Sequence, residues 1–386
     1  MNKTPQSNRL QVGIFGKTNA GKSSLFNALC ETDIAIVSPQ PGTTTDYVRK
    51  AMELTPFGPI VLYDTAGLGD ETILGQKRVS KTLKLLNRID FVLYVECDED
   101  DCYDGFKALL EKKQIPHMIV HSYDNIAELK KNLIQCLSAI KRDDETILGD
   151  LLPTGSTVLM VVPIDSAAPK GRLILPQAQL IRDCLDNGIM AYVVTENDIE
   201  AAFANLKRVD LVVTDSQVFR LVASKTPPEI PLTSFSILMA KQKGKIEVLL
   251  EGIEAVNKLK AGDKVLISEV CTHNRTHEDI GREKIPAALH RLCQGDGSPD
   301  TLNMRQRGCQ ENRPLDIDFT TGRDFPEDLS VYDLIIHCGA CMITSREMQN
   351  RIRDAREARV PITNYGLFLA YANGILERSI EVLKND

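Results

Sequence analysis

An apolar strand pattern runs directly into a glycine-rich loop and a helical pattern near the start of the chain. Residues 10–15 (LQVGIF) are followed by GKTNAGKS at 16–23 and then by SLFNAL. This is the G-x-x-x-x-G-K-S pattern in the strand–loop–helix context that it requires. Its glycines let successive backbone N–H groups converge on phosphate oxygens, and the helix N-terminus adds a favourable dipole. The stretch predicts an α/β domain that binds a nucleoside phosphate.

The side chains of this loop have separate expected roles. Lys22 supplies a positive charge to the β- and γ-phosphates, and Ser23 supplies a hydroxyl to Mg²⁺. The candidate nucleotide-binding residues are Gly16, Asn19, Ala20, Gly21, Lys22, Ser23 and Ser24.

Two further motifs follow at the positions expected for a GTPase. The strand pattern of residues 60–64 ends in Asp64-Thr-Ala-Gly67, a D-x-x-G in which Asp64 suits a water-mediated contact to Mg²⁺. Between the two loops, Thr44 lies where a switch segment would present a hydroxyl to the metal. The candidate catalytic residues are Lys22, Ser23, Thr44, Asp64 and Gly67, and the candidate Mg²⁺ residues are Ser23, Thr44 and Asp64.

These motifs together resemble the small GTPases of the Era and tRNA-modification (TrmE) type. Leu68 follows Gly67 where Ras-like enzymes place a glutamine that orients water. In GTPases with an apolar residue there, the resemblance implies that the loop asparagine, here Asn19, helps to bind an activating potassium ion.

The segment expected to recognise the base departs from the GTPase pattern. The strand pattern of residues 115–121 ends in His121-Ser-Tyr-Asp124, where Asn-Lys-x-Asp is expected, and a helical pattern follows at once. About one β–α unit is therefore expected to be absent. Asp124 offers the carboxylate that guanine recognition needs, and a solvated loop aspartate is the alternative.

The composition limits the class of protein. The chain has 386 residues, of which 43% are hydrophobic, and a net charge of −7. Proteins that coat nucleic acids or bind membrane surfaces need a basic field, so neither is expected. The sequence has no run of about 18 apolar residues and no signal-peptide core, so we expect a cytoplasmic protein. The ten cysteines are then expected to be core residues, metal ligands or catalysts and not disulfides.

Residues 153–245 show strand patterns that alternate with helical patterns. Strands are expected at 158–162, 190–194 and 209–215, with helices between them, which indicates a parallel sheet. Cys184 lies among apolar residues on one expected helix and is interpreted as a core residue. Because no catalytic cluster is visible, we expect a connecting or dimerising domain.

Two strand patterns near the C-terminus each end at cysteine. Residues 264–270 run into Cys271-Thr-His273, and residues 333–337 run into Cys338-Gly-Ala-Cys341. If the two strands are neighbours in a parallel sheet, their carboxyl ends open into one crevice. The pattern Thr344-Ser-Arg-Glu347 predicts a helix start just after the cysteines. A final helix is expected at about 367–383.

Spacing alone leaves the role of these cysteines open. Zinc accepts three cysteines and a histidine, whereas a four-iron, four-sulfur cluster with three cysteines leaves one iron for another ligand. Unliganded core cysteines are a third interpretation. The candidate metal ligands are Cys271, His273, His337, Cys338 and Cys341.

Taken together, the phosphate-loop domain, the segment PIDSAAPKGRLILPQ and the pattern CTH…DIGREKIP…HCGAC resemble the HydF family of FeFe-hydrogenase maturation GTPases. The family pattern Cys-x-His, then His-Cys-x-x-Cys, matches Cys271, His273, His337, Cys338 and Cys341. The chain departs from it in a long gap that includes the insertion 294–313, and in Asn274, where a second histidine is common.

The resemblance implies a homodimeric scaffold that binds GTP, Mg²⁺ and a 4Fe-4S cluster. Such a scaffold receives a di-iron precursor from two radical-SAM maturases and transfers it to the FeFe-hydrogenase apoprotein. We expect an α/β chain of three domains, namely a shortened P-loop GTPase domain at 1–152, a dimerisation domain at 153–245 and an iron–sulfur domain at 246–386. The alternatives are an RNA- or ribosome-associated GTPase with structural zinc, and a redox dithiol protein that uses Cys338 and Cys341.

Overall fold

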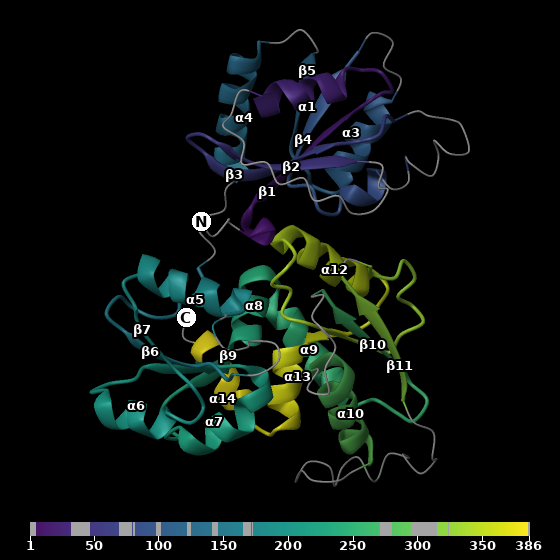
Figure 1. Ribbon diagram of the computed structural model, residues 1–386. Helices are drawn as coiled ribbons and strands as arrows, with labels where there is room; N and C mark the ends of the chain where they lie inside the picture. Colours follow the sequence, from purple (N-terminus) through teal and green to yellow (C-terminus); the bar gives the residue numbers. More distant parts are fainter. Residues whose placement is uncertain are drawn as a thin grey trace. The chain divides into compact units, whose positions relative to one another are not determined.

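The computed structural model divides into two compact units, residues 1–144 and 145–386. It describes residues 5–31, 47–68, 79, 82–97, 102–121, 125–140, 146–164, 171, 173–270, 280–294, 315–322 and 324–384. Figure 1 shows the ribbon of both units.

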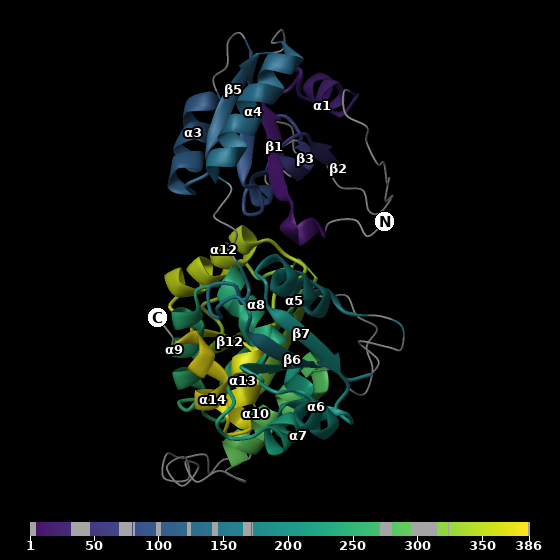
Figure 2. The ribbon, with the colours of Figure 1, turned by 90° about the vertical axis from the view of Figure 1, so that its left-hand side faces the viewer.

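The first unit is a five-stranded sheet covered on both faces. Its elements are the 3-10 turn η1 (Gln6–Asn8), β1 (Leu10–Gly16), α1 (Lys22–Glu31), β2 (Val48–Leu54), β3 (Gly58–Asp64), β4 (Phe91–Glu96), α3 (Tyr103–Lys112), β5 (His117–His121) and α4 (Ile126–Ile140). The strand order is β2-β3-β1-β4-β5, and every pair is parallel except β2 with β3. Apolar residues of α1 and α4 pack on one face and those of α3 on the other. Figure 2 shows α1 and α3 on opposite sides of the sheet.

The predicted shortening of this domain agrees with the topology. The α4 helix follows the edge strand β5, and no further strand pairs with the sheet in the described part of this unit. The β–α unit that would complete the base-recognition side of the domain is therefore missing there.

The second unit begins with a parallel sheet of four strands. Its elements are β6 (Thr157–Val161), α5 (Leu175–Asp186), β7 (Met190–Val194), α6 (Ile199–Asn205), β8 (Leu211–Thr214), η2 (Ser216–Val218), α7 (Phe219–Lys225), β9 (Leu232–Ser234) and α8 (Phe235–Lys243). The strand order is β7-β6-β8-β9. Helices α5 and α8 bury apolar residues against one face, and α6 and α7 against the other.

A second parallel sheet of four strands completes this unit. Its elements are α9 (Ile246–Val256), β10 (Lys264–Glu269), the π-helical turn η3 (Ile280–Lys284), α10 (Ile285–Gln294), β11 (Asp316–Thr321), β12 (Leu334–His337), α12 (Ser345–Glu357), β13 (Ile362–Asn364), α13 (Tyr365–Ala372), α14 (Leu376–Ile380) and η5 (Glu381–Leu383). The strand order is β11-β10-β12-β13. The sequence left it open whether the two cysteine-terminated strands are neighbours, and the structure shows that β10 and β12 pair in parallel.

The two sheets of the second unit share one continuous core. Buried residues of β6 and β8 belong to the same apolar cluster as those of β10 and β12. The α13 helix lies between the two sheets (Figure 1) and packs against α8, α9 and α10. Gly366 allows this close approach, since a Cβ there would lie 2.9 Å from Ser234 Oγ. Residues on both sides of the predicted boundary at 245 thus contribute to one apolar core.

The prediction of one helix over residues 367–383 is wrong. The helix α13 ends at Ala372, and α14 begins only at Leu376. Between them Gly374 has a φ of 70°, which lies in the left-handed region that ends a helix.

Candidate functional site

The phosphate loop joins β1 to α1 as the sequence predicts. Asn19 and Gly21 have φ values of 64° and 93°, so the backbone turns through left-handed conformations before the helix begins at Lys22. The Lys22 side chain is buried, and its Nζ donates to the carbonyl oxygen of Lys17 at 2.6 Å. The ammonium is therefore held within the loop, where a phosphate chain would need it.

The structure brings two of the predicted Mg²⁺ residues together. Ser23 Oγ donates to Asp64 Oδ2 at 2.7 Å. The other oxygen, Asp64 Oδ1, is buried and lacks a hydrogen-bond partner among the described residues. An unsatisfied buried carboxylate oxygen is costly, so this pair fits a cation that would accept the lone pair. Thr44, the third predicted Mg²⁺ residue, lies outside the described residues.

The D-x-x-G segment lies directly against the phosphate loop. Leu68 N donates to Gly16 O at 3.0 Å, and Thr18 N donates to Leu68 O at 3.3 Å. A Cβ on Gly67 would lie 2.7 Å from Thr18 N, so only glycine fits this approach. The segment that would sense a γ-phosphate is thus bonded to the loop that binds phosphates. Asp124, predicted for base recognition, lies outside the described residues.

The second candidate site is the cysteine loop, which we define as residues 338–344. It begins where β12 ends, and Ser268 of β10 pairs in register with His337 of β12. Val270 N donates to Cys338 Sγ at 3.2 Å. The carboxyl ends of β10 and β12 therefore lie together. Cys271 is the residue after Val270 in the sequence, so this end of the sheet is where the sequence predicts the site.

The cysteine loop turns sharply before α12. Ala340 has a φ of 56°, in the left-handed region that disfavours residues with a Cβ. The α12 helix begins at Ser345, and Thr344 Oγ1 accepts from Glu347 N at 3.2 Å, so the predicted N-cap is confirmed. A helix N-terminus favours nearby negative charge, which suits thiolates in the preceding loop.

His337 is completely buried, and both of its ring nitrogens have partners. Its Nδ1 lies 2.8 Å from Cys338 O, and its Nε2 lies 3.0 Å from Nη1 of Arg351. A carbonyl accepts and a guanidinium donates, so Nδ1 bears the proton and Nε2 accepts. In this arrangement His337 shapes the base of the loop, and its role as a metal ligand stays a prediction.

Cys338 and Cys341 supply two of the sulfur ligands that a metal site needs, and the further ligands would have to come from residues outside the described part of the chain. Cys338 and Cys341 are buried, 6% and 9% exposed. No group of three possible metal ligands comes together among the described residues. Cys271 and His273, which would complete the set, lie outside them. Two buried thiols, one of which already accepts an N–H bond, form a soft donor pair suited to zinc or iron.

Cys184 is a core residue, as predicted. It is fully buried in α5, and burial raises its pKa to about 12, with the Asp183 carboxylate as a smaller cause. A thiol with such a pKa remains protonated and does not serve as a ligand or nucleophile at neutral pH.

Sequence reasoning missed two cations beneath the cysteine loop. Lys243, only 3% exposed, ends α8, and its Nζ donates to the carbonyl oxygens of Ala340, Cys341 and Ile343 at 3.2, 3.1 and 2.9 Å. Arg351, 4% exposed, lies on α12 and reaches both Ser268 and His337. Neither residue belongs to a local motif, because each reaches the loop only through the packing of a helix.

The N-terminal fold and its loop geometry define a P-loop GTPase domain. Residues 11–142 match the family described as 50S ribosome-binding GTPase. Among curated proteins, the chain is 45% identical over 87 residues to the tRNA modification GTPase MnmE of Thermus thermophilus, which covers 22% of this chain and 20% of that protein. It is 34% identical over 135 residues to GTPase Der of Nautilia profundicola, which covers 35% and 26%. The chain thus spans only about a fifth to a quarter of the length of these relatives.

The remainder of the chain identifies the family. Residues 147–244 match the hydrogen maturase F dimerization domain, and residues 247–382 match the hydrogen maturase F tetramerization domain. These two domains span more than half of the chain, and with the preceding GTPase domain they show that the chain belongs to the HydF family.

Two solved structures show a distant likeness. NFeoB of S. thermophilus bound to GDP·AlF4⁻ is 18% identical with a TM-score of 0.21, covering 37% of this chain and 74% of that one. Era in complex with MgGDPNP and a 16S ribosomal RNA segment is 15% identical with a TM-score of 0.24, covering 81% and 92%. Likenesses this low have no bearing on function.

Proposed function

We propose that this HydF-family GTPase is a scaffold that binds a 4Fe-4S cluster through Cys271, Cys338 and Cys341. It receives a di-iron precursor from radical-SAM maturases and delivers it to the FeFe-hydrogenase apoprotein. The observation that supports this most is the meeting of two strand ends. Val270, one residue before Cys271, donates its N–H to the sulfur of Cys338.

The chain's own residues suit a cluster held at the end of β12. A 4Fe-4S cluster bound by three thiolates leaves one iron for an exchangeable ligand, which suits a carrier. The Val270 N–H stabilises the thiolate of Cys338, and the N-terminus of α12 stabilises negative charge in the loop. Lys243 places a further positive charge below the loop. The same surroundings would stabilise a zinc thiolate site, so metal content decides between the two.

In the first unit, hydrolysis of GTP depends on the residues that surround its phosphates. Lys22 would contact the β- and γ-phosphates, while Ser23 and Asp64 would hold Mg²⁺ directly or through water. Asn19 is exposed in the loop and has left-handed backbone, and we propose it as a ligand of an activating potassium ion. Asp124 would select guanine, and Thr44 would complete the Mg²⁺ shell.

Association into a homodimer is proposed to use β7. This strand lies at the edge of its sheet and exposes Met190, Tyr192 and Val193 by 49%, 44% and 45%. Such an edge is a ready template for strand addition by a second copy. The strand lies within the region that matches the family's dimerization domain.

The proposed location is the cytoplasm, where thiols stay reduced. In the described part of the chain, no helix has the length and apolar character needed to cross a membrane.

The visible spectrum and metal content of anaerobically purified protein test the cluster. We expect a brown protein with about four iron and four sulfide per chain after reconstitution. Colourless protein with stoichiometric zinc that resists replacement by iron would reject the scaffold. That result would favour an RNA- or ribosome-associated GTPase with a structural zinc site.

Potassium dependence tests the role of Asn19. We expect potassium to stimulate GTP hydrolysis over sodium at equal ionic strength, and Asn19→Ala to remove most of that stimulation. Stimulation that persists in Asn19→Ala would remove Asn19 from the proposed potassium site. Lys22→Ala serves as the control for complete loss of hydrolysis.

A further inference from the structure

The last turn of α8, residues 240–243, contacts two segments that are far apart in the sequence. One is the cysteine loop at 338–344. The other is the junction segment, which we define as residues 146–150, where the chain enters the second unit after the GTPase domain. Lys241 and Lys243 are two positions apart on the helix, so they point about 200° away from each other. Each of the two segments therefore meets a different face of the same turn.

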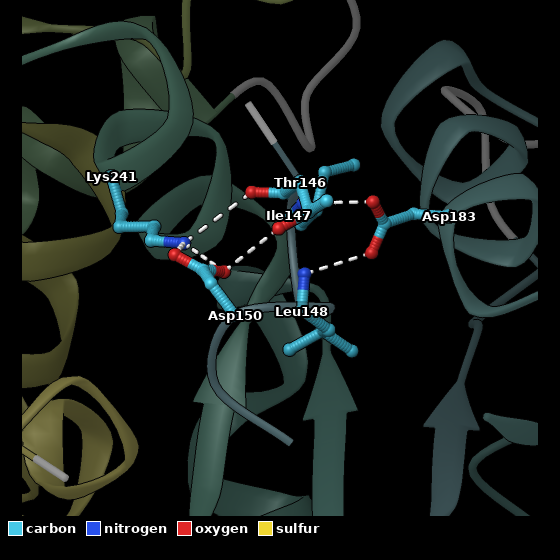
Figure 3. Close-up of polar contacts among 6 residues, drawn as sticks. All are labelled: Thr146, Ile147, Leu148, Asp150, Asp183 and Lys241. Carbon is cyan, nitrogen blue, oxygen red and sulfur yellow. Dashed lines mark hydrogen bonds and ion pairs between the residues drawn. The ribbon is translucent and has the colours of Figure 1, made fainter. Parts of the chain in front are cut away.

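The junction segment is fixed to the second unit by buried backbone and side-chain contacts. Asp183 of α5 accepts from Ile147 N at 2.9 Å and from Leu148 N at 2.8 Å. Ile147 and Leu148 are buried in the same core cluster as Leu238 and Met239 of α8. Figure 3 shows the segment between Asp183 on one side and Lys241 on the other.

Lys241 joins this segment to α8. Its Nζ donates to Thr146 O at 3.3 Å and forms an ion pair with Asp150. Asp150 also accepts from Thr146 Oγ1 at 3.0 Å, so the ion pair closes a small ring of contacts (Figure 3). A displacement of residues 146–150 would therefore act on the last turn of α8.

Lys243 joins the same turn to the cysteine loop. Its three ammonium protons match the three carbonyl acceptors of Ala340, Cys341 and Ile343, and the group is buried. Two of these acceptors belong to the turn in which Ala340 has its unfavourable positive φ. The lysine thus holds a conformation that the loop sequence alone disfavours.

We propose that the last turn of α8 couples the junction segment to the cysteine loop. The ion pair of Lys241 and Asp150 passes a displacement of the junction segment to the last turn of α8. Lys243 is the positioning residue through which that turn sets the geometry of the cysteine loop. Because the junction follows the GTPase domain directly, the state of the nucleotide reaches the cysteines through this turn. The proposal concerns the regulation of the cysteine site, and its importance for a cluster rests on the proposed function.

Hydrogen exchange in the full-length, metal-free protein tests the coupling. Peptides from 338–344 are compared with GDP and with a non-hydrolysable GTP analogue, both with Mg²⁺. We expect the two nucleotides to change exchange in the wild-type loop by about twofold to fivefold, the range that a partly exposed ion pair can supply. In Lys241→Met and in Asp150→Asn this nucleotide difference is lost, while nucleotide affinity is unchanged.

Two further variants separate coupling from general loosening of the fold. Lys243→Met removes the ammonium that donates to the carbonyl oxygens of Ala340, Cys341 and Ile343, so loop exchange becomes about tenfold faster with either nucleotide. Lys245→Met, at an exposed lysine two residues further on, behaves as wild type. Exchange in β6 stays unchanged in every variant and controls for global unfolding.

The coupling is overturned if the wild-type loop exchanges equally with both nucleotides, or if the difference survives in both Lys241→Met and Asp150→Asn. The role of Lys243 is overturned if Lys243→Met folds and its loop exchanges as in wild type. If Lys243→Met does not fold, the Lys241 and Asp150 variants still decide the coupling. Iron and sulfide reconstitution of the wild type is measured separately, and its failure would reject the proposed cluster without altering the exchange results.

Discussion

The two sheets of the second unit repeat one design. In each sheet the strands lie in the same spatial order, with the second strand of the chain at one edge and then the first, third and fourth (β7-β6-β8-β9 and β11-β10-β12-β13). Every pairing in both sheets is parallel. An aspartate before the third strand of each sheet makes the same bond, from Thr157 N to Asp210 at 2.9 Å and from Lys264 N to Asp333 at 2.8 Å. In each sheet the last strand enters a helix through a polar N-cap, Ser234 or Asn364.

The repeats differ where the third strand ends. In the first, Thr214 donates to Val161 O at 3.2 Å, and Asp215 accepts from Gln177 Nε2 at 2.8 Å. In the second, the equivalent residues are His337 and Cys338, and the cations Lys243 and Arg351 lie beneath them. At the end of β8 polar side chains are hydrogen-bonded within the fold, whereas at the end of β12 buried thiols lie near Lys243 and near Arg351, which is ion-paired with Glu347 at 3.6 Å. The equivalent strand end therefore carries structural hydrogen bonds in one repeat and a candidate metal site in the other.

The repeats also differ at their edge strands. The β7 edge exposes apolar side chains, whereas the equivalent β11 edge has Asp316 and Asp318 paired with Lys264. Charged edges resist strand addition, and apolar edges permit it. This contrast supports association through the first sheet.

The largest expected effect tests the difference between the two crevices. Changing Cys338 or Cys341 to Ala removes a donor from the proposed site, so reconstituted iron should fall from about four per chain to nearly zero. Iron and sulfide analysis measures this, and GTP hydrolysis should remain largely intact.

The matched control is Cys184→Ala in the first repeat. Its thiol is buried and protonated, so the variant should retain full iron content. Iron loss as large in Cys184→Ala as in Cys338→Ala would mean that general destabilisation, and not ligand loss, explains the result.

The next effect tests the edge strands. The double variant Met190→Lys with Tyr192→Lys places two charges on β7, and we expect at least about 2 kcal/mol weaker dimerisation, or roughly thirtyfold. Sedimentation velocity across a concentration series measures it. Asp316→Lys on β11 is the control and should leave this dimerisation constant as it is. An unchanged constant in the β7 variant would place the dimer elsewhere.

A smaller effect compares the two N-caps. Ser234→Ala should lower the free energy of unfolding by about 1 kcal/mol, the usual cost of losing such a cap. Asn364→Ala should cost about 1 kcal/mol more, because Asn364 Nδ2 also donates to Ser236 Oγ at 3.1 Å. Urea unfolding of both variants measures the difference. Equal costs would show that the bond to Ser236 contributes little.

The smallest effect concerns acid stability at the charged β11 edge. The hydrogen bond from Lys264 lowers the pKa of Asp318. The Asp318 carboxylate therefore adds to the free energy of unfolding above the unfolded-state pKa, and this stabilisation is lost as the pH falls through the lower folded-state pKa. Asp318→Asn should therefore lower the urea midpoint slightly at pH 7, and the difference should disappear in strong acid. A difference that grew on acidification would contradict this sign.

Local patterns in the sequence predicted most of the elements and the residues of both loops. The phosphate-loop motif, the D-x-x-G motif and the strand ends at Cys271 and Cys338 are recognisable because their chemistry lies in consecutive residues. The alternating strands and helices indicated parallel sheets, but they did not show that β10 and β12 are neighbours, because strand order depends on tertiary packing. The missing β–α unit after His121 was also visible as a lack of sequence between motifs.

Only the tertiary structure decided what surrounds the cysteines. Lys243 is an ordinary lysine at the end of a helix until α8 packs beside the cysteine loop, and Arg351 is one of several arginines on α12. His337 was a candidate ligand by sequence, yet its ring nitrogens are bonded to Cys338 O and Arg351. Residues close in sequence reveal which groups can do chemistry, but their electrostatic environment comes from helices that reach them through the core.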